Sequence, residues 1–280
     1  MVAFPNCKIN LGLNIIRRRE DNYHDIETIF YPLKINDAVE VVQRSSGDNL
    51  ESSVEFSCSG LSIDSELENN LCLKAYALLK KDFPQLPKIK MHLHKAIPIG
   101  AGLGGGSADG AFVLKLLNEK FQLHLSAEQL ISYALQLGSD CPFFIVNETC
   151  FAQGRGEILE KIHVGLSAYK FLIVNPNIHI NTGVAFSQIN PAVPKKSIRE
   201  IIQQPLETWK EELTNDFERS VFEDHPVLKN IKHQLYETSA VYASMSGSGS
   251  TCFGIFHSSQ KIQTNIFSKD FFVKEIIDAA

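Results

Sequence analysis

The first regular pattern along the chain is a strict alternation of apolar and polar positions over residues 8–15. Every second residue is isoleucine or leucine, and the positions between them carry polar side chains or glycine. A period of two predicts a half-buried strand, with one apolar and one polar face. Lys8 and Asn10 are therefore expected to lie next to each other on the polar face.

Further apolar runs bounded by turn-forming residues predict more strands, and apolar residues at helical spacing predict helices. Asn69 and Asn70 precede the helical spacing, and asparagine is a suitable cap for a helix to about residue 83; Ser126 with Gln129 forms a capping-box pattern for another to about residue 137. Further helices are expected after residue 107, over 181–188, between 205 and 238, and near 259–267. The remaining predicted strands span residues 26–33, 37–42, 54–58, 88–94, 143–152, 171–174, 241–244, 252–256 and 271–276.

The strands and helices do not alternate regularly, which favours an α+β fold over a doubly wound parallel sheet. The pattern loosens between residues 154 and 167, before a new apolar strand begins. We therefore expect two domains, residues 1–155 and residues 156–280. The length of 280 residues agrees with this division, because one domain typically takes about 100–200 residues.

Composition excludes several classes of protein. With 27 basic and 32 acidic side chains the net charge is -5, which argues against nucleic acid as a partner. The six cysteines include no Cys-x-x-Cys pair, so a zinc site is not expected and the thiols are interpreted as buried and reduced. The chain shows no signal peptide and no apolar stretch of the ~18 residues that a membrane span requires. These features predict a soluble, cytoplasmic protein.

The strongest local signal is a glycine run, because residues 100–106 contain five of the 17 glycines in the chain. Glycine permits positive φ angles and close approach of a ligand, and the N-terminus of the predicted helix that follows attracts anions. A glycine loop leading into a helix predicts a phosphate site. The run lacks the Gly-Lys-Ser/Thr of a P-loop. Gly100, Gly102 and Gly105 satisfy GxGxxG, but residues 96–98 interrupt the approach from the strand, so this dinucleotide fingerprint is weak.

Four other features are chemically suggestive but have common structural explanations. The Gly/Ser loop at residues 246–250 would ordinarily be a hairpin turn, and Asp140 in the loop 138–142 would ordinarily be a cap or turn residue. Lys8 and His24 would ordinarily be solvated surface side chains. Spacing along the sequence does not by itself bring these residues together.

Three segments, in this order, resemble the motifs of the GHMP kinases. Residues 5–11 are similar to the first motif, residues 98–108 to the second, phosphate-binding motif, and residues 245–249 to the third. Residues 22–24, 138–144 and 154–157 are similar to one member of the family, which phosphorylates a sugar alcohol linked to cytidine diphosphate. The matches extend from residue 5 to about residue 256, nearly the whole chain.

This resemblance implies an ATP-dependent kinase with a two-domain α+β GHMP kinase fold and an active site in the cleft between the domains. It implies that Asp140 takes the proton of the substrate hydroxyl, that Lys8 pairs with Asp140, and that Asn10 holds the sugar alcohol. The cytidine diphosphate end would be bound by Tyr23, His24, Thr182 and Phe186. The ATP phosphates would be wrapped by Pro98, Ile99, Gly100, Ala101, Gly102, Leu103, Gly104, Gly105, Gly106, Ser107 and Ala108. Mg²⁺ is expected with ATP, and no acidic metal ligand stands out.

Two positions depart from the family pattern, and they leave the details open. Cys7 stands where alanine or serine is usual, and Asp109 stands where asparagine is common, which leaves the metal arrangement beside the phosphate loop undefined. One alternative is another GHMP kinase, acting on a mevalonate-type or amino-alcohol substrate. The other is a non-catalytic ligand- or RNA-binding module on a similar fold. The aromatic Tyr23 favours a nucleobase, and the absence of a basic patch disfavours RNA.

Overall fold

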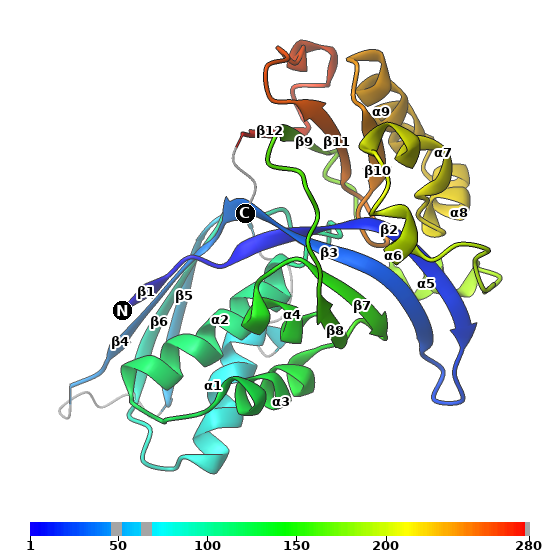
Figure 1. Cartoon of the computed structure of the whole chain (residues 1–280). Helices are drawn as coiled ribbons and strands as arrows, with labels where there is room; N and C mark the ends of the chain where they lie inside the picture. Colours follow the sequence, from blue (N-terminus) through cyan, green and yellow to red (C-terminus); the bar gives the residue numbers. More distant parts are fainter. Residues whose placement is uncertain (46–51, 63–68, 278–280) are drawn as a thin grey trace. The chain divides into compact units, whose positions relative to one another are not determined.

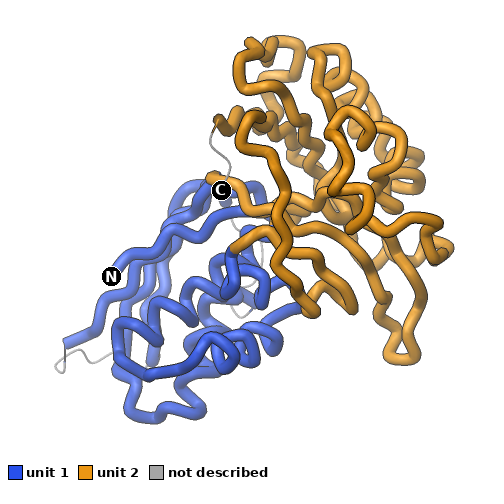
Figure 2. The backbone as a smooth tube through the Cα atoms, viewed as in Figure 1, with its two compact units in different colours: residues 1–7, 35–99, 104–147 blue, residues 8–34, 100–103, 148–280 orange. Residues whose placement is uncertain are grey.

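The computed structural model describes residues 1–45, 52–62 and 69–277, and its contacts divide the chain into two compact units (Figures 1 and 2). Unit 1 contains residues 1–7, 35–99 and 104–147, and unit 2 contains residues 8–34, 100–103 and 148–280. The glycine-rich segment therefore crosses from one unit to the other and back. The predicted boundary near residue 155 is a different division and stays a prediction.

Unit 1 pairs a four-stranded sheet with four helices (Figure 1). The strands, in spatial order, are β1 (Val2–Ala3), β4 (Ala38–Gln43), β6 (Ile89–Lys95) and β5 (Val54–Gly60). The helices are α1 (Leu71–Asp82), α2 (Gly105–Lys120), α3 (Ala127–Leu137) and α4 (Cys141–Val146), and α2 packs against the other three. Val39 and Met91 are buried while their neighbours Glu40 and Lys90 are exposed, so alternation along β4 and β6 defines one apolar face.

Unit 2 holds two further four-stranded sheets. The first has the order β2 (Asn6–Arg18), β3 (His24–Asn36), β7 (Cys150–Gly154), β8 (Ile158–Lys161), and the second β10 (Tyr242–Met245), β11 (Cys252–His257), β9 (Tyr169–Asn175), β12 (Phe272–Ile276). The helices are α5 (Thr182–Ser187), α6 (Ile198–Ile201), α7 (Trp209–Glu212), α8 (Phe217–Asp224) and α9 (Pro226–Glu237), with 3₁₀ turns η2 (Leu206–Thr208) and η3 (Thr264–Ile266). Helix α9 packs against β10 and β11, where Leu228 and Leu235 are fully buried.

Most predicted elements are confirmed, including the capping of α1 by Asn70 and the capping box of Ser126 and Gln129. The strand predicted over 143–152 is wrong in its first part, because residues 141–146 form α4 and only β7 follows. Pro142 lies in the first turn of α4, and Asn147 ends it in a left-handed conformation with φ of 53°. A six-residue apolar run of which five residues are buried has no period that separates helix from strand.

Three other expectations differ from the structure. The helix predicted near 259–267 is wrong, and only the 3₁₀ turn η3 forms there. Strand β2 is confirmed, but its half-buried character is wrong, since every residue from 6 to 15 is buried. The short elements β8 and α6 were not predicted. Residues 45–49, a run of Ser, Gly, Asp and Asn that predicts a turn between two strands, lie mostly outside the described residues.

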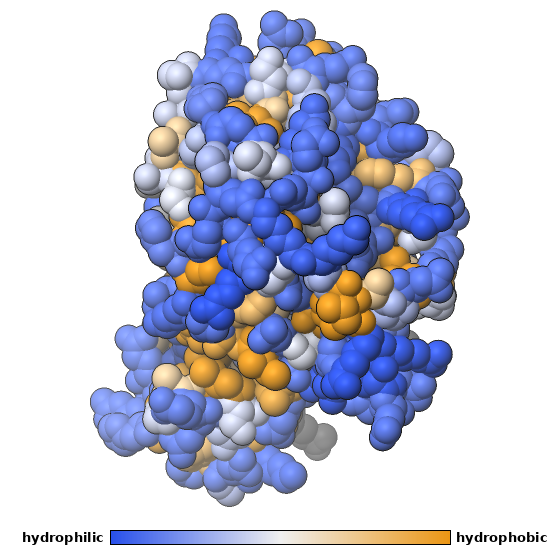
Figure 3. Space-filling model, turned by 45° about the vertical axis from the view of Figure 1, so that its right-hand side comes forward, coloured by the Kyte–Doolittle hydropathy of each residue, from blue (hydrophilic) through white to orange (hydrophobic). Residues whose placement is uncertain are grey.

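The mean hydropathy of the sequence is close to zero, at -0.06. The face shown in Figure 3 is mainly hydrophilic, with scattered apolar areas. Within the described part of the chain, no helix combines the length and apolar character needed to cross a membrane.

Candidate active site

The glycine-rich segment is a turn of alternating handedness that leads into α2. Gly100, Gly102 and Gly104 adopt positive φ angles of 64°, 75° and 71°, and Gly104 is the N-cap of the helix. The helix begins at Gly105, three residues earlier than predicted, so the last two glycines of the run belong to its first turn. The first backbone N–H groups of a helix lack internal partners and carry partial positive charge. The segment is therefore built to hold an anion such as a phosphate.

In unit 2 the third motif packs directly on this segment. A Cβ atom added to Gly102 would lie 2.0 Å from the backbone oxygen of Ser246, so no other residue fits. The hydroxyl of Ser246 donates a 2.8 Å hydrogen bond to the Gly102 carbonyl. The backbone N–H of Thr251 donates to the Ala101 carbonyl at 3.2 Å. The loop at 246–250 is thus part of the same site, as the resemblance implied.

Lys8 and Asn10 are neighbours on β2, as the alternation predicted. The Lys8 ammonium donates to Asn10 Oδ1 at 2.7 Å and to the Gly102 carbonyl at 3.1 Å. Asn10 Nδ2 donates to the Thr28 hydroxyl at 3.0 Å. Lys8 is only 3% exposed, so it is not the solvated lysine that a strand position usually implies. The first, second and third motifs therefore meet in one hydrogen-bonded cluster.

Asn215 is a component of this cluster that the sequence analysis missed. Its Nδ2 donates to the carbonyls of Met245 and Gly247, both at 2.8 Å, and it is 3% exposed. These bonds fix the start of the third-motif loop. No local pattern marks Asn215, because its role depends on tertiary packing.

The residues predicted to bind cytidine diphosphate are partly brought together. The His24 imidazole stacks on Phe186, with ring centroids 4.8 Å apart and planes inclined by 13°. Tyr23 lies instead against the Arg155 guanidinium, 4.8 Å from it, and is 56% exposed. The Thr182 hydroxyl is 3.0 Å from that of Ser248. Burial of the His24 ring, with the charge of Arg18, lowers its pKa, so the imidazole is neutral at pH 7.

Unit 1 contains a buried charged triad that the sequence analysis did not predict. The Lys95 ammonium forms ion pairs with Asp37 and with Asp109, the latter at 2.7 Å, and all three side chains are at least 95% buried. Asp37 Oδ1 also accepts the backbone N–H groups of Ala96 and Ile97 at 2.6 and 2.9 Å. The triad thus anchors the chain just before the glycine-rich segment.

Two members of the triad, Lys95 and Asp109, border a cavity of about 120 Å³. Asp109 Oδ1 is buried without a hydrogen-bond partner, although Oδ2 is paired with Lys95. Burial raises the pKa of the Asp109 carboxyl to about 7, the negative charge of Asp37 adds to this, and Lys95 opposes it. The remaining walls are Asn69, Asn70, Leu71, Leu93, Ile99 and Gly106. The cavity therefore lies beside a carboxyl group with one unpaired oxygen and beside an ammonium, and its other walls are partly apolar and partly amide.

Asp140, the predicted base, is the half-buried N-cap residue of α4 in unit 1. Its neighbour Cys141 is fully buried, which raises the pKa of that thiol to about 12 and makes it unreactive. Lys8 belongs to unit 2, so the pairing of Lys8 with Asp140 stays a prediction.

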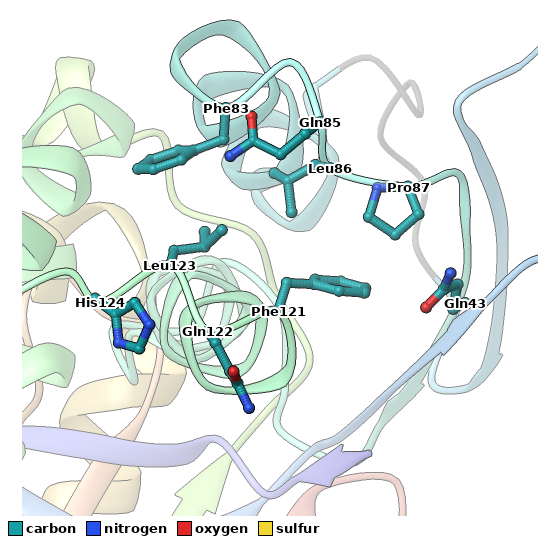
Figure 4. A pocket seen from close by; sticks show the side chains of 9 residues that line it. All are labelled: Gln43, Phe83, Gln85, Leu86, Pro87, Phe121, Gln122, Leu123 and His124. Atoms are coloured by element: carbon teal, nitrogen blue, oxygen red, sulfur yellow. The ribbon is translucent and has the colours of Figure 1, made fainter.

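A larger pocket of about 510 Å³ in unit 1 contains none of the predicted site residues (Figure 4). It is bordered by Gln43, Phe83, Gln85, Leu86, Pro87, Phe121, Gln122, Leu123 and His124. No carboxylate or lysine is among these side chains, so phosphoryl transfer chemistry does not fit it. The described residues also contain no group of three or more His, Cys, Asp or Glu side chains placed to hold a metal.

The comparisons with known proteins agree with this geometry. The family model "GHMP kinases N terminal domain" matches residues 70–148, and "GHMP kinases C terminal" matches residues 197–269. A solved mevalonate kinase has the same fold, with a TM-score of 0.71 over 98% of both chains at 13% identity. The chain is therefore a GHMP kinase, and as such it uses ATP.

Relatives with higher sequence identity to this chain show to which group of GHMP kinases it belongs. The 4-diphosphocytidyl-2-C-methyl-D-erythritol kinase of Bacteroides fragilis is 50% identical over 97% of each chain, and that of Cytophaga hutchinsonii is 47% identical over 92% of this chain and 93% of its own. A crystal structure titled as the same kinase superimposes with a TM-score of 0.77 at 29% identity, over 91% of this chain and 89% of the other. The chain belongs to the 4-diphosphocytidyl-2-C-methyl-D-erythritol kinases.

The contact of Gly102 with Ser246 predicts that substitution by alanine lowers the melting temperature at Gly102 but not at Gly106. Gly102→Ala should lower the melting temperature by at least about 4 °C, because alanine disfavours positive φ and its Cβ would clash with a backbone oxygen. Gly106→Ala is the matched control, since a Cβ there meets nothing within 4 Å and alanine favours the helix. Thermal unfolding of both variants measures this. Equal melting temperatures would show that the close contact is not required.

Proposed function

We propose that this chain transfers the γ-phosphoryl group of ATP to the 2-hydroxyl of 4-diphosphocytidyl-2-C-methyl-D-erythritol. The products are ADP and the 2-phosphate, in the cytoplasmic, non-mevalonate route to isoprenoid precursors. The observation that carries the proposal is the cluster of Lys8, Asn10, Gly102 and Ser246, which joins all three family motifs in a chain with relatives of this activity.

The glycine-rich segment, residues 98–108, holds the ATP phosphates in this proposal, and the cavity beside Asp109 receives the base. The apolar side chains among its walls, Leu71, Leu93 and Ile99, suit the faces of a flat ring. In this proposal the unpaired Asp109 Oδ1 accepts from an amino group and the Lys95 ammonium donates to a ring nitrogen, which is supported by the position of both residues in the cavity lining. Adenine presents this combination of an amino donor and ring acceptors, which supports ATP as the donor.

Mg²⁺ would accompany ATP and neutralise charge on its phosphates. Among the described residues, no three or more His, Cys, Asp or Glu side chains are grouped to bind a metal. Mg²⁺ in kinases usually binds through one or two carboxylates and the substrate phosphates, so it does not need such a group. Asp109 does not fit as a ligand, because Oδ2 is paired with Lys95 inside the core. We assign no protein ligand to the metal.

Asp140 is proposed as the general base and Lys8 as the cation beside the reacting groups. As the substrate oxygen forms its bond to the γ-phosphorus, its proton passes to the Asp140 carboxylate, and the bond from phosphorus to the β-phosphate oxygen breaks. Phosphoryl transfer depends mainly on positioning and charge stabilisation, so few catalytic side chains are needed. The bonds of Lys8 to Asn10 and Gly102 support a fixed position for its ammonium.

Tyr23, His24, Thr182 and Phe186 are proposed to bind the cytidine diphosphate end. In the structure the His24 ring covers the face of Phe186 that a base would use. Cytosine would therefore take the place of His24 on Phe186, with Tyr23 closing on its other face. The displaced neutral imidazole, which both donates and accepts a hydrogen bond, would then read the polar edge of the base.

Asp140→Asn should lower kcat by about 10²–10⁴, the usual contribution of a general base. ATP affinity should hardly change, because Asp140 is proposed to touch only the transferred proton. Steady-state kinetics and ATP titration of the same preparation measure both quantities. Near-normal turnover in the variant would remove Asp140 from the mechanism.

Asp109→Asn should flatten the pH dependence of ATP affinity. In the native chain the carboxyl is protonated below its pKa of about 7 and ionised above it, so its affinity for an amino donor should rise from about pH 6 to pH 8. The ionisation of ATP affects both proteins equally. The difference between their two curves of ATP affinity against pH therefore reports the ionisation of Asp109 alone. Binding of ITP, which lacks the 6-amino group, is the ligand control. Parallel pH curves for the two proteins would contradict this assignment.

The cytidine site predicts that stacking and base selection can be separated. Phe186→Ala and Tyr23→Ala should weaken cytidine diphosphate and uridine diphosphate alike, because stacking is worth about 1–3 kcal/mol per base without choosing among bases. His24→Ala should narrow the difference between the two nucleotides, since selection comes from hydrogen bonds. Calorimetric titration gives all the affinities. An unchanged cytidyl preference in His24→Ala would exclude readout by this side chain.

A further inference from the structure

The outer face of the unit 1 sheet carries a chain of four polar side chains that contains none of the residues assigned to the kinase site. Strand β5 runs parallel to β6, and the register places Ser57 opposite His92 and Ser59 opposite His94 (Figure 1). Burial alternates along β6, and both histidines take the open positions. Both serines and His94 are exposed, and His92 is half-buried. The four side chains therefore lie together on a face that small molecules can reach.

The imidazole of His92 is held at both of its nitrogens. Ser57 Oγ lies 2.8 Å from Nδ1, and Ser59 Oγ lies 2.9 Å from Nε2. Ser59 Oγ also lies 2.9 Å from Nδ1 of His94, so this one hydroxyl contacts two imidazole rings. The register of two parallel strands thus links two serines and two histidines in alternation.

The three contacts are all hydrogen bonds when His92 carries its proton on Nδ1. That N–H donates to the Ser57 oxygen, and Nε2 accepts from the Ser59 O–H. The Nδ1–H of His94 then donates to the Ser59 oxygen. Ser59 thereby directs its proton at an imidazole nitrogen whose ring is oriented by a third group. A nucleophile, a base and a group that orients the base form the arrangement of an activated nucleophile.

The neighbours of this chain leave the Ser59 hydroxyl as the group that the imidazole activates. Lys90 and Glu55, the preceding pair on the same two strands, form an ion pair at 3.0 Å, so their charges balance each other. Cys58 is exposed and lies between the two serines in the sequence. Alternation along β5 directs its thiol to the opposite face of the strand, away from the imidazoles.

We propose that Ser59 is a nucleophile that accepts an acyl group from an activated carboxylic ester, with His92 as its general base. The Ser59 oxygen bonds to the carbonyl carbon while its proton passes to His92 Nε2, and the bond from that carbon to the leaving oxygen breaks. The leaving oxygen takes the proton from His92, so the products are acyl-Ser59 and an alcohol or phenol. Ser57 is a positioning residue that fixes the ring of His92.

The class of ester follows from the exposure of the site. Ser59 is exposed on its strand, so the site does not enclose its substrate, and the reaction requires an ester with a good leaving group. The proposed acylation uses none of the kinase residues, and it does not depend on the phosphoryl transfer proposed above.

The test is a brief reaction of the full-length protein with p-nitrophenyl acetate, without ATP or cytidyl substrate, followed by an acid quench. Neutral hydroxylamine then removes acetyl groups from thiols, and tandem mass spectrometry locates those that remain. Ser59 should be acetylated at least about tenfold faster than Ser53, because a general base accelerates proton removal. Ser53 is an exposed serine of the same segment, and among the described residues its hydroxyl contacts no imidazole. A smaller ratio, or no acetyl group on Ser59, would overturn the proposal.

Variants separate activation by the base from mere exposure of the hydroxyl. His92→Gln should slow acetylation of Ser59 at least about tenfold, because glutamine forms hydrogen bonds but cannot take the proton. Ser57→Ala should also slow it, and Ser57→Thr, which keeps the hydroxyl, should restore the native rate. Cys58→Ala is the matched control, since it changes the adjacent exposed residue and should leave the rate unchanged. Native acetylation of Ser59 in His92→Gln, or its loss in Cys58→Ala, would contradict the assignment.

Discussion

The contact between Gly102 and the backbone of Ser246 is the constraint on which the site in unit 2 depends. A glycine is required because a Cβ atom would stand 2.0 Å from the Ser246 oxygen. This approach lets one carbonyl, that of Gly102, accept hydrogen bonds from both the Lys8 ammonium and the Ser246 hydroxyl. Segments that lie 94 and 144 residues apart in the sequence are thereby joined around one backbone oxygen.

In unit 1 the buried triad of Lys95, Asp37 and Asp109 fixes the chain that leads into the glycine-rich segment. Lys95 is shared by two carboxylates, so the core carries an excess of negative charge when both are ionised, and burial raises the pKa of Asp109. Asp37 accepts the backbone N–H groups that lead into the glycine-rich segment. The same triad therefore fixes the loop and leaves one carboxylate oxygen of Asp109 without a hydrogen-bond partner. A base with an amino group suits this oxygen better than one with a carbonyl.

Local signals in the sequence predicted the parts of the fold that short-range physics determines. Asn70 and Ser126 cap their helices as expected, and a period of two placed Lys8 beside Asn10. Helix α4 was missed because a buried apolar hexapeptide looks the same as a buried strand. Asn215 and the Lys95 triad have no local signature, because their partners are distant in the sequence. The resemblance named the site residues, but it could not show that His24 covers Phe186.

We propose that this kinase acts on a cytidyl substrate rather than on mevalonate or homoserine, which the names of other proteins with this fold mention. The most direct measurement is a coupled assay of ADP release with 4-diphosphocytidyl-2-C-methyl-D-erythritol, mevalonate and homoserine as separate acceptors. We predict rapid, saturable ADP release with the cytidyl substrate and only background release with the other two. Comparable or faster turnover of mevalonate or homoserine would contradict the account.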